Sequence, residues 1–452
     1  MTPYTRVTTG ISGLDEILNY LQMGDNVVLQ VDDIADYQRF VDPYVRAARS
    51  RRQRVVYMRF ANHAPLLQAE EVSHIYTLNA NRGFESFSTE VHNIIRDEGR
   101  DVFYVFDSLS DLLLAWATDL MIGNFFVITC PYLFELNTVA YFALLRSRHS
   151  FKTVARIRET TQVLLDVYNN DGKICVHPLK AWKRYTPTMY LPHVMEDEKF
   201  VPILNSADAA GILSYLTHKS ATGGVRNLDY WERIFLKATG ILEDPGAAAE
   251  KQEMVDTLSR VMIGREKRML ALVKEYFSLE DLVEIKKRLI GTGFIGGKSV
   301  GMLLARNILR GDPTFDWNAE LEIHDSFFIG SDIFYSYMVQ NGWWKLLMAQ
   351  KTDEGYFEVA RELKQKMLHG IFPDEVKEQF QLMLEYYGQA PIIVRSSSLL
   401  EDAFGNAFAG KYESYFCVNQ GTPEERYRTF EDAVRKIFAS TMNEDALTYR
   451  LQ

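Results

Sequence analysis

Two short segments carry the residue types that could hold a phosphate group. The first, GTGFIGGKSVGMLLARNILRG at 291–311, is rich in glycine and places Lys298 where an apolar helical run begins. Glycines let a backbone approach a ligand, a helix start offers free N–H groups, and the lysine adds a positive charge. We therefore expect Gly296, Gly297 and Lys298 to contact a phosphate. A glycine-rich turn that packs into a helix and binds nothing explains the same residues equally well.

The first segment does not have the spacing of a P-loop. That motif needs Gly, four residues and then Gly-Lys-Ser/Thr, which would require glycine where this chain has Thr292. The preceding residues, 278–290, predict a charged amphipathic helix, whereas a P-loop follows a buried strand. The sequence argues against a Walker-type loop.

The second segment is APIIVRSSSLLEDAFGNAFAGKYESYFCVN at 390–419. Its apolar run predicts a strand that ends at Arg395, and three serines and the acids Glu401 and Asp402 follow. A permanently charged guanidinium beside serine hydroxyls suits phosphate oxygens. For the two acids, a structural role that holds the loop and a role in ligand contact remain equal alternatives. Lys298 lies far earlier in the chain, so the two cations can meet only through folding.

Length, composition and charge restrict the class of protein. A chain of 452 residues with 47% hydrophobic and 24% charged residues predicts a globular protein of two or three domains. The net charge of −10 argues against a general nucleic-acid-binding protein. The three cysteines lack metal-binding spacing, and no signal peptide or membrane span is read, so we expect a cytoplasmic protein without a structural zinc site.

The first ~190 residues predict an α/β fold with a parallel sheet, because strand-like and helical runs alternate. After residue 150, alternating runs between 153 and 179 contain the turn signal Asn169–Gly172 and predict a hairpin that adds antiparallel strands at one edge. The expected parallel strands are 26–31, 54–60, 74–78, 101–107 and 125–130.

This N-terminal part resembles the RecA-like ATPases of the circadian-clock type. TTGISGLDEIL at 8–18 is similar to their first segment, and DVFYVFDSLSDLL places Asp107 where the magnesium-side acid stands in that family. The family's phosphate loop is missing, because VLQVDDIADYQRF follows the first strand and its aspartates would repel a triphosphate. We therefore expect a RecA-like fold without ATP hydrolysis. Asp107 is interpreted as a strand-end or helix-capping acid in preference to a metal ligand.

The ordered set of motifs after residue 290 resembles the N-terminal nucleotide-binding domain of phosphoenolpyruvate synthases and pyruvate phosphate dikinases, an ATP-grasp fold. The resemblance rests on GGKSVGMLLARNIL, FFIGSDIFYSYMVQNG and VRSSSLLEDAFGNAFAGKYESYF. It implies ATP contacts from Lys298 and Arg395, support from the serines, and a flap that closes over the phosphates. The predicted ATP-binding residues are Gly296, Gly297, Lys298, Arg395, Ser396, Ser397, Phe408, Ala409 and Gly410.

The resulting domain prediction has three parts. Residues 1–200 form the RecA-like domain, 201–289 a helical connector, and 290–452 the first part of the ATP-grasp α+β domain. The connector includes one long predicted helix from about 250 to 277.

The resemblance also implies cofactors and partners. Members of that family transfer a phosphoryl group from ATP, through a phosphohistidine, to pyruvate, and Mg²⁺ neutralises the developing charge. The acidic metal ligands, the phosphohistidine domain and the pyruvate- or phosphoenolpyruvate-binding barrel are expected outside these 452 residues. No nucleic-acid or membrane partner is predicted, and a homo-oligomer is compatible with the sequence.

Two functions follow. The favoured one is the ATP-binding portion of a phosphotransferase of this family, incomplete in this chain as a catalyst. The alternative is a non-catalytic nucleotide sensor or interaction module with vestigial nucleotide folds.

Overall fold

A computed structural model describes residues 6–170, 172–196, 199–205, 228–244, 246–322, 325–401, 408 and 410–451. The chain divides into two compact units, residues 1–233 and 234–452. The three-part division into 1–200, 201–289 and 290–452 stays a prediction.

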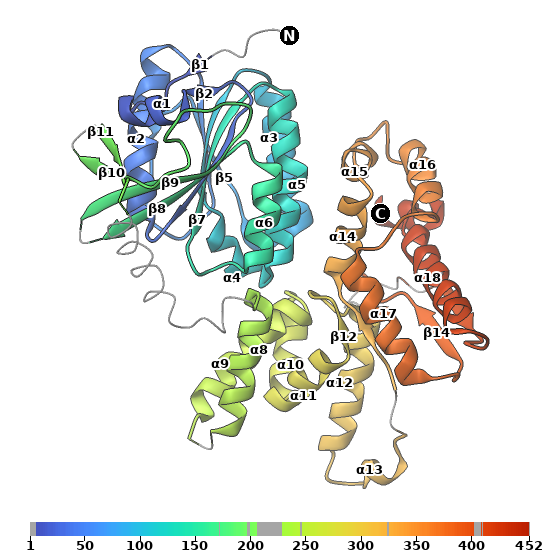
Figure 1. Ribbon diagram of the computed structural model, residues 1–452. Coiled ribbons are helices and arrows are strands. Elements are labelled where there is room, and N and C mark those ends of the chain that lie inside the picture. Colours follow the sequence, from blue (N-terminus) through green and yellow to red (C-terminus); the bar gives the residue numbers. More distant parts are fainter. Residues whose placement is uncertain are drawn as a thin grey trace. The chain divides into compact units, whose positions relative to one another are not determined.

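The first unit is built on a nine-stranded sheet with the order β11-β10-β9-β8-β3-β7-β6-β4-β5 (Figure 1). The strands from β8 to β5 in this order run parallel, whereas β9, β10 and β11 add antiparallel pairs at one edge. The strands are β3 (Asn26–Val31), β4 (Val55–Arg59), β5 (His74–Thr77), β6 (Phe103–Ser108), β7 (Val139–Leu145), β8 (Val163–Asn170), β9 (Lys173–Ala181), β10 (His193–Glu196) and β11 (Lys199–Pro202). The predicted α/β class and the antiparallel edge hairpin, β8–β9, are confirmed.

Helices cover both faces of this sheet (Figure 1). One face packs on α2, through buried Tyr37, Phe40 and Tyr44. The other face packs on α5, whose Phe125 and Phe126 contact rings of β6 and β7. The helices of this unit are α1 (Ser12–Leu18), α2 (Ile34–Ser50), α3 (Phe84–Glu98), α4 (Leu113–Trp116), α5 (Asp119–Glu135) and α6 (Phe151–Thr160), and a short pair, β1 (Arg6–Val7) with β2 (Leu21–Gln22), lies beside them.

Three predicted elements are wrong. Residues 125–130 lie inside α5 and form no strand, because this helix is apolar on every side and shows no helical period. The parallel strand in its place is β7. Residues 153–160 belong to α6, which begins after Ser150, whose hydroxyl accepts from the Thr153 N–H. The long helix expected at 250–277 is two helices, because the Glu266 side chain caps a second helix at its start.

The second unit is mainly helical, with two small sheets (Figure 1). β12 (Leu289–Ile290) pairs in parallel with β13 (Phe328–Ile329), and β14 (Ile392–Arg395) pairs antiparallel with β15 (Ser414–Cys417). The helices are α8 (Tyr230–Glu243), which begins in the first unit, α9 (Ala248–Met262), α10 (Lys267–Tyr276), α11 (Leu279–Lys287), α12 (Gly297–Gly311), α13 (Trp317–Glu320), α14 (Ser331–Gln340), α15 (Trp344–Gln350), α16 (Glu358–Met367), α17 (Asp374–Tyr387), α18 (Pro423–Ser440) and α19 (Glu444–Leu451).

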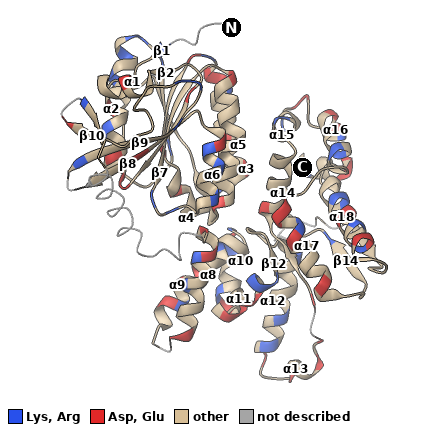
Figure 2. Cartoon of the chain, in the orientation of Figure 1, with Lys and Arg blue, Asp and Glu red and all other residues tan. Residues whose placement is uncertain are grey.

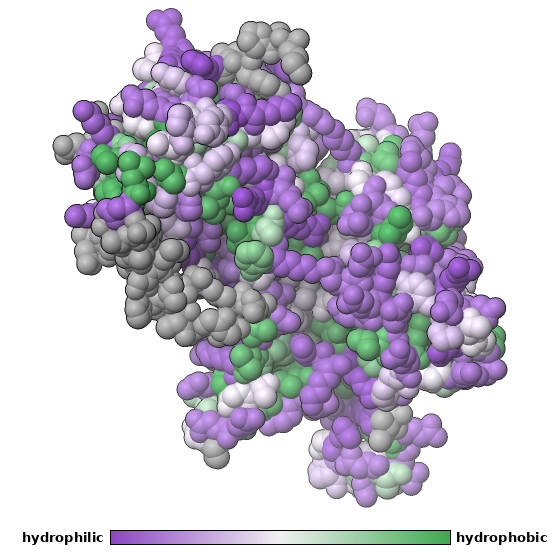
Figure 3. Space-filling model, in the orientation of Figure 1, coloured by the Kyte–Doolittle hydropathy of each residue, from purple (hydrophilic) through white to green (hydrophobic). Residues whose placement is uncertain are grey.

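Charged residues of both signs lie mainly on the helices. Basic and acidic side chains are spread over the helices of both units, with α12 carrying only basic ones, whereas the central strands of the large sheet are mostly uncharged (Figure 2). The face in Figure 3 is mainly hydrophilic, with hydrophobic residues scattered over it. Within the described ranges, no helix combines the length and apolar character that crossing a membrane requires.

Candidate nucleotide site in the second unit

The glycine-rich loop lies between β12 and α12 and is anchored on one side to the start of α14. The Phe294 N–H donates to Ser331 Oγ at 3.0 Å, and the Ser331 N–H donates to the Phe294 carbonyl at 3.0 Å. Thr292 donates its hydroxyl to Asp332 Oδ2 at 2.8 Å and accepts the Asp332 N–H at 3.2 Å. The threonine that breaks the P-loop spacing therefore holds the loop in place.

The buried Asp332 carboxyl makes this anchor pH-sensitive. Burial raises its pKa from 3.8 to about 6. Because the folded-state pKa lies above the unfolded one, the group stabilises the fold below about pH 4, and this contribution is lost as the pH rises through 6. We expect wild type to lose about 2 kcal/mol relative to Asp332→Asn between pH 4 and pH 7, measured as urea unfolding free energies. Parallel pH profiles of the two proteins would contradict this expectation.

The other side of the loop packs against the serine segment. The Gly297 N–H donates to the Ser398 carbonyl at 2.9 Å, and the Ser299 N–H and hydroxyl each donate to Ser397 Oγ at 3.0 Å. A Cβ on Gly296 would lie 1.4 Å from the Ser397 carbonyl oxygen, and Gly296 also has a φ of +82°. These glycines are therefore required for close backbone packing, whether or not a ligand binds.

Lys298 is held in an ion pair by Glu401. Its Nζ lies 2.5 Å from Glu401 Oε1 and donates to Ser396 Oγ at 3.3 Å. Glu401 is fully buried, and its second oxygen accepts the Ser398 N–H at 2.8 Å. Of the two alternatives for this acid, the structural role is the one the contacts describe, because each of its oxygens accepts from protein donors.

Arg395 lies on the outer face of the β14–β15 sheet. Val394 and Cys417 are buried on the inner face, which packs on α18, whereas Arg395 is exposed beside Ile393. Phe416, the partner of Ile393 across the sheet, is 83% exposed. Within the described part of the chain, the Arg395 guanidinium has neither a hydrogen bond nor an ion pair.

The structure thus brings together most of the predicted residues. Gly296, Gly297 and Lys298 meet Ser396 and Ser397, about a hundred positions later. Arg395 immediately precedes this group in the chain, and its meeting with Lys298 at a shared phosphate stays a prediction.

The predicted flap is described in part. Phe408 is buried against Tyr412, Ala446 and Tyr449. Gly410 has a φ of +69° and open space around its α-carbon. Ala409 and Asp402 lie outside the described residues.

In the first unit, the residues that follow β3 make structural contacts within the protein. Asp33 caps α2 by accepting the Ala35 N–H. Asp32 accepts from Arg146 Nε at 2.8 Å, and Arg146 NH1 lies 2.5 Å from Asp166. The guanidinium also stacks 4.3 Å from the Tyr168 ring centre. Asp32 is therefore neutralised by Arg146, whereas Asp33 serves as a helix cap.

Asp107, at the end of β6, is completely buried and accepts only from protein donors in its described contacts. Arg59 donates to it at 2.6 Å, the N–H groups of Phe60 and Ala61 donate at 2.8 Å, and the Tyr57 hydroxyl donates as well. This arrangement agrees with the strand-end interpretation of Asp107. Across the described residues, no group of three His, Cys, Asp or Glu side chains is placed to hold a metal ion.

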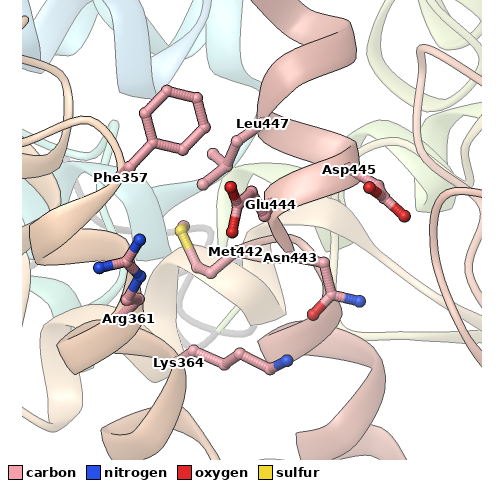
Figure 4. Close-up of a pocket in the computed structure, with 8 residues that line it drawn as sticks. All are labelled: Phe357, Arg361, Lys364, Met442, Asn443, Glu444, Asp445 and Leu447. Atoms are coloured by element: carbon pink, nitrogen blue, oxygen red, sulfur yellow. The ribbon is translucent and has the colours of Figure 1, made fainter.

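The second unit contains a cavity of about 330 Å³ that no sequence motif predicted (Figure 4). Arg361 and Lys364 of α16 line it, together with the turn from α18 into α19. A single sequence shows these cations as ordinary charges on the polar face of a helix, so the cavity becomes visible only when α16 and α19 are packed.

One comparison with known proteins gives a match. Residues 292–452 match the family described as "Pyruvate phosphate dikinase, AMP/ATP-binding domain". A search of curated proteins gives no match. The match covers about a third of the chain and shows that this segment is similar to that AMP/ATP-binding domain, which does not favour the alternative of a vestigial module.

Proposed function

We propose that the second unit binds ATP as the nucleotide-binding portion of a phosphotransferase similar to phosphoenolpyruvate synthases and pyruvate phosphate dikinases. One observation carries the proposal. Lys298 Nζ lies 3.3 Å from Ser396 Oγ, 98 positions apart, so that folding joins the glycine–lysine motif to the arginine–serine motif. Both motifs lie inside the segment that matches an AMP/ATP-binding family.

Lys298 is proposed to contact a phosphate through its remaining hydrogen. An ammonium group has three N–H donors, and Glu401 and Ser396 accept two of them. The side chain is 24% exposed, so the third donor can reach a ligand. Glu401 then acts as a positioning residue that fixes the direction of the ammonium group.

Arg395 is proposed to bind the phosphates from the adjacent exposed sheet face. Its guanidinium forms no bond with any described residue, so it can bind a phosphate without first breaking an ion pair. Bidentate hydrogen bonds from a guanidinium suit phosphate oxygens. The Phe408–Gly410 turn as a flap over the phosphates and the ATP-grasp fold itself remain proposals.

Magnesium does not fit the described acids near Lys298. Glu401 already accepts from Lys298, Ser396 and the Ser398 N–H, so we assign it no metal. The transfer to pyruvate through a phosphohistidine, a cytoplasmic location and a homo-oligomeric state are likewise proposals taken from the resemblance and the sequence.

For the first unit we propose a RecA-like domain without a phosphate loop, serving as a docking or regulatory module. Its parallel sheet with helices on both faces supports the fold. The internal pairing of Asp32 with Arg146 supports the loss of nucleotide hydrolysis.

Calorimetric titration of the full chain with ATP and Mg²⁺ tests the proposal. Arg395→Ala is the cleanest variant, because no described bond has to break and the fold should be unaffected. We expect it to weaken ATP binding by about 10- to 100-fold, the range for hydrogen bonds to charged groups. Arg428→Ala, an exposed arginine on α18, is the matched control and should leave the affinity unchanged. Equal affinities of wild type and Arg395→Ala, or no binding by folded wild type, would overturn the proposal.

A further inference from the structure

The cavity beside α16 combines apolar walls with charges of both signs. Phe357, Met442 and Leu447 lie together on one side of it (Figure 4). Met442 and Leu447 are buried, so their positions are fixed by packing. Phe357 is the partly exposed member of this wall, so a hydrocarbon or aromatic group would contact the cavity mainly through its ring.

The two cations of the cavity come from successive turns of one helix. Arg361 and Lys364 are three positions apart on α16, a spacing that places them on the same side of a helix. Neither has an ion pair within the described residues. A carboxylate bound between them would receive hydrogen bonds from both.

One carboxylate, that of Glu444 at the start of α19, lies toward the cavity, whereas the Asp445 carboxylate points away from the other lining side chains (Figure 4). Both residues line the cavity and form no ion pair within the described part of the chain. The groups directed at the cavity thus combine the two cations Arg361 and Lys364 with the carboxylate of Glu444. A dianion such as a phosphate monoester would meet repulsion from Glu444, whereas a ligand with one charge of each sign would match both the cations and this acid.

The turn that carries these acids is held in place from behind. Tyr356 donates its hydroxyl to the Leu447 carbonyl at 3.1 Å, and the Asn443 amide donates to Glu413 at 3.2 Å. The Asn443 N–H also donates to the Ser440 carbonyl at 3.1 Å. The site is therefore largely formed before a ligand binds, which lowers the entropic cost of binding.

We propose that this cavity binds a small zwitterion, an α-amino acid with an apolar side chain. Its carboxylate lies between Arg361 and Lys364, its ammonium group faces Glu444, and its side chain contacts Phe357 and Met442. The volume of about 330 Å³ is at the lower end of the range for small-molecule sites and accommodates a ligand of this size. This inference is independent of the proposed ATP site, because no residue is shared.

Ligand-observed NMR titration of the full chain with L-phenylalanine and L-leucine, in the absence of nucleotide, tests the inference. We expect saturable binding with a Kd of about 1 mM or tighter. Phenylacetate, which lacks the ammonium group, and phenethylamine, which lacks the carboxylate, should each bind at least about tenfold more weakly, the loss of one charged hydrogen bond. Phenylacetate binding as tightly as L-phenylalanine would overturn the zwitterion assignment.

Substitutions of the lining residues test whether the amino acid binds in this cavity. Lys364→Ala and Glu444→Ala should each weaken L-phenylalanine binding about tenfold or more. Lys366→Ala, on the same helix but outside the cavity lining and paired with Glu362, is the matched control and should have no effect. Absence of amino-acid binding to the wild type, or equal affinities of all variants, would overturn the proposal, and neither result bears on ATP binding.

Discussion

Lys298→Met is expected to lower the free energy of unfolding of the second unit by about 3–5 kcal/mol, the usual loss when one partner of a buried ion pair is removed. Glu401 would then keep a fully buried carboxylate, and among the described contacts its remaining donors are Ser396 and the Ser398 N–H. The free energy of unfolding is measured by chemical denaturation, and amide hydrogen exchange in α12 and β14 shows that the loss lies in the second unit.

A double-mutant cycle shows whether the pairing causes this loss. Glu401→Gln combined with Lys298→Met removes both charges, and we expect the double variant to be more stable than Lys298→Met alone. Lys287→Met, which removes an exposed lysine paired with Glu284, is the control and should change stability by less than about 1 kcal/mol. Additive losses in the cycle would mean that the two charges do not interact.

Asp107→Ala is expected to destabilise the first unit by a similar amount, about 3–5 kcal/mol. The substitution leaves the largely buried Arg59 guanidinium without its carboxylate, and it also removes the acceptor for the Phe60 and Ala61 N–H groups. Amide exchange in β4 and β6 should accelerate by about 10²- to 10⁴-fold, since each factor of ten corresponds to 1.4 kcal/mol.

The matched control is Asp97→Ala, which removes an exposed carboxylate of α3 paired with exposed Arg96. We expect exchange in β4 and β6 to remain near the wild-type rate in this variant. If Asp107→Ala behaves like Asp97→Ala, the buried carboxylate does not stabilise the sheet.

The sequence predicted the elements that have a strong period or a strong boundary signal. The apolar runs of β3, β4 and β6 are short and bounded by polar residues, and the turn residues around Gly172 predicted the β8–β9 hairpin. Helix α5 could not be separated from a strand, because both of its long sides are buried and no polar face marks its period.

For the candidate site, the sequence could identify residue types but not their partners. It predicted that Lys298 and Arg395 contact the same phosphates, and this stays a prediction, although Lys298 does bond to Ser396 next to Arg395. It left the role of Glu401 open, because the bond from Lys298 joins residues 103 positions apart, a relation that no local pattern encodes. The cavity beside α16 could not be predicted for the same reason, since its lining residues, 357–364 and 442–447, are distant in the sequence.

The guanidinium of Arg146 has a consequence for how the first unit responds to its surroundings. Arg146 directly follows β7 and lies beside the end of β3 and the middle of β8. There it contacts Asp32, Asp166 and the carbonyl oxygens of Gln30 and Val167, and its side chain is only 8% exposed. These ion pairs and hydrogen bonds neutralise the two acids and tie the neighbouring strands together, so the fold of this region does not depend on a bound ligand. The melting temperature of this unit should therefore be set by its own side chains and be insensitive to added nucleotide.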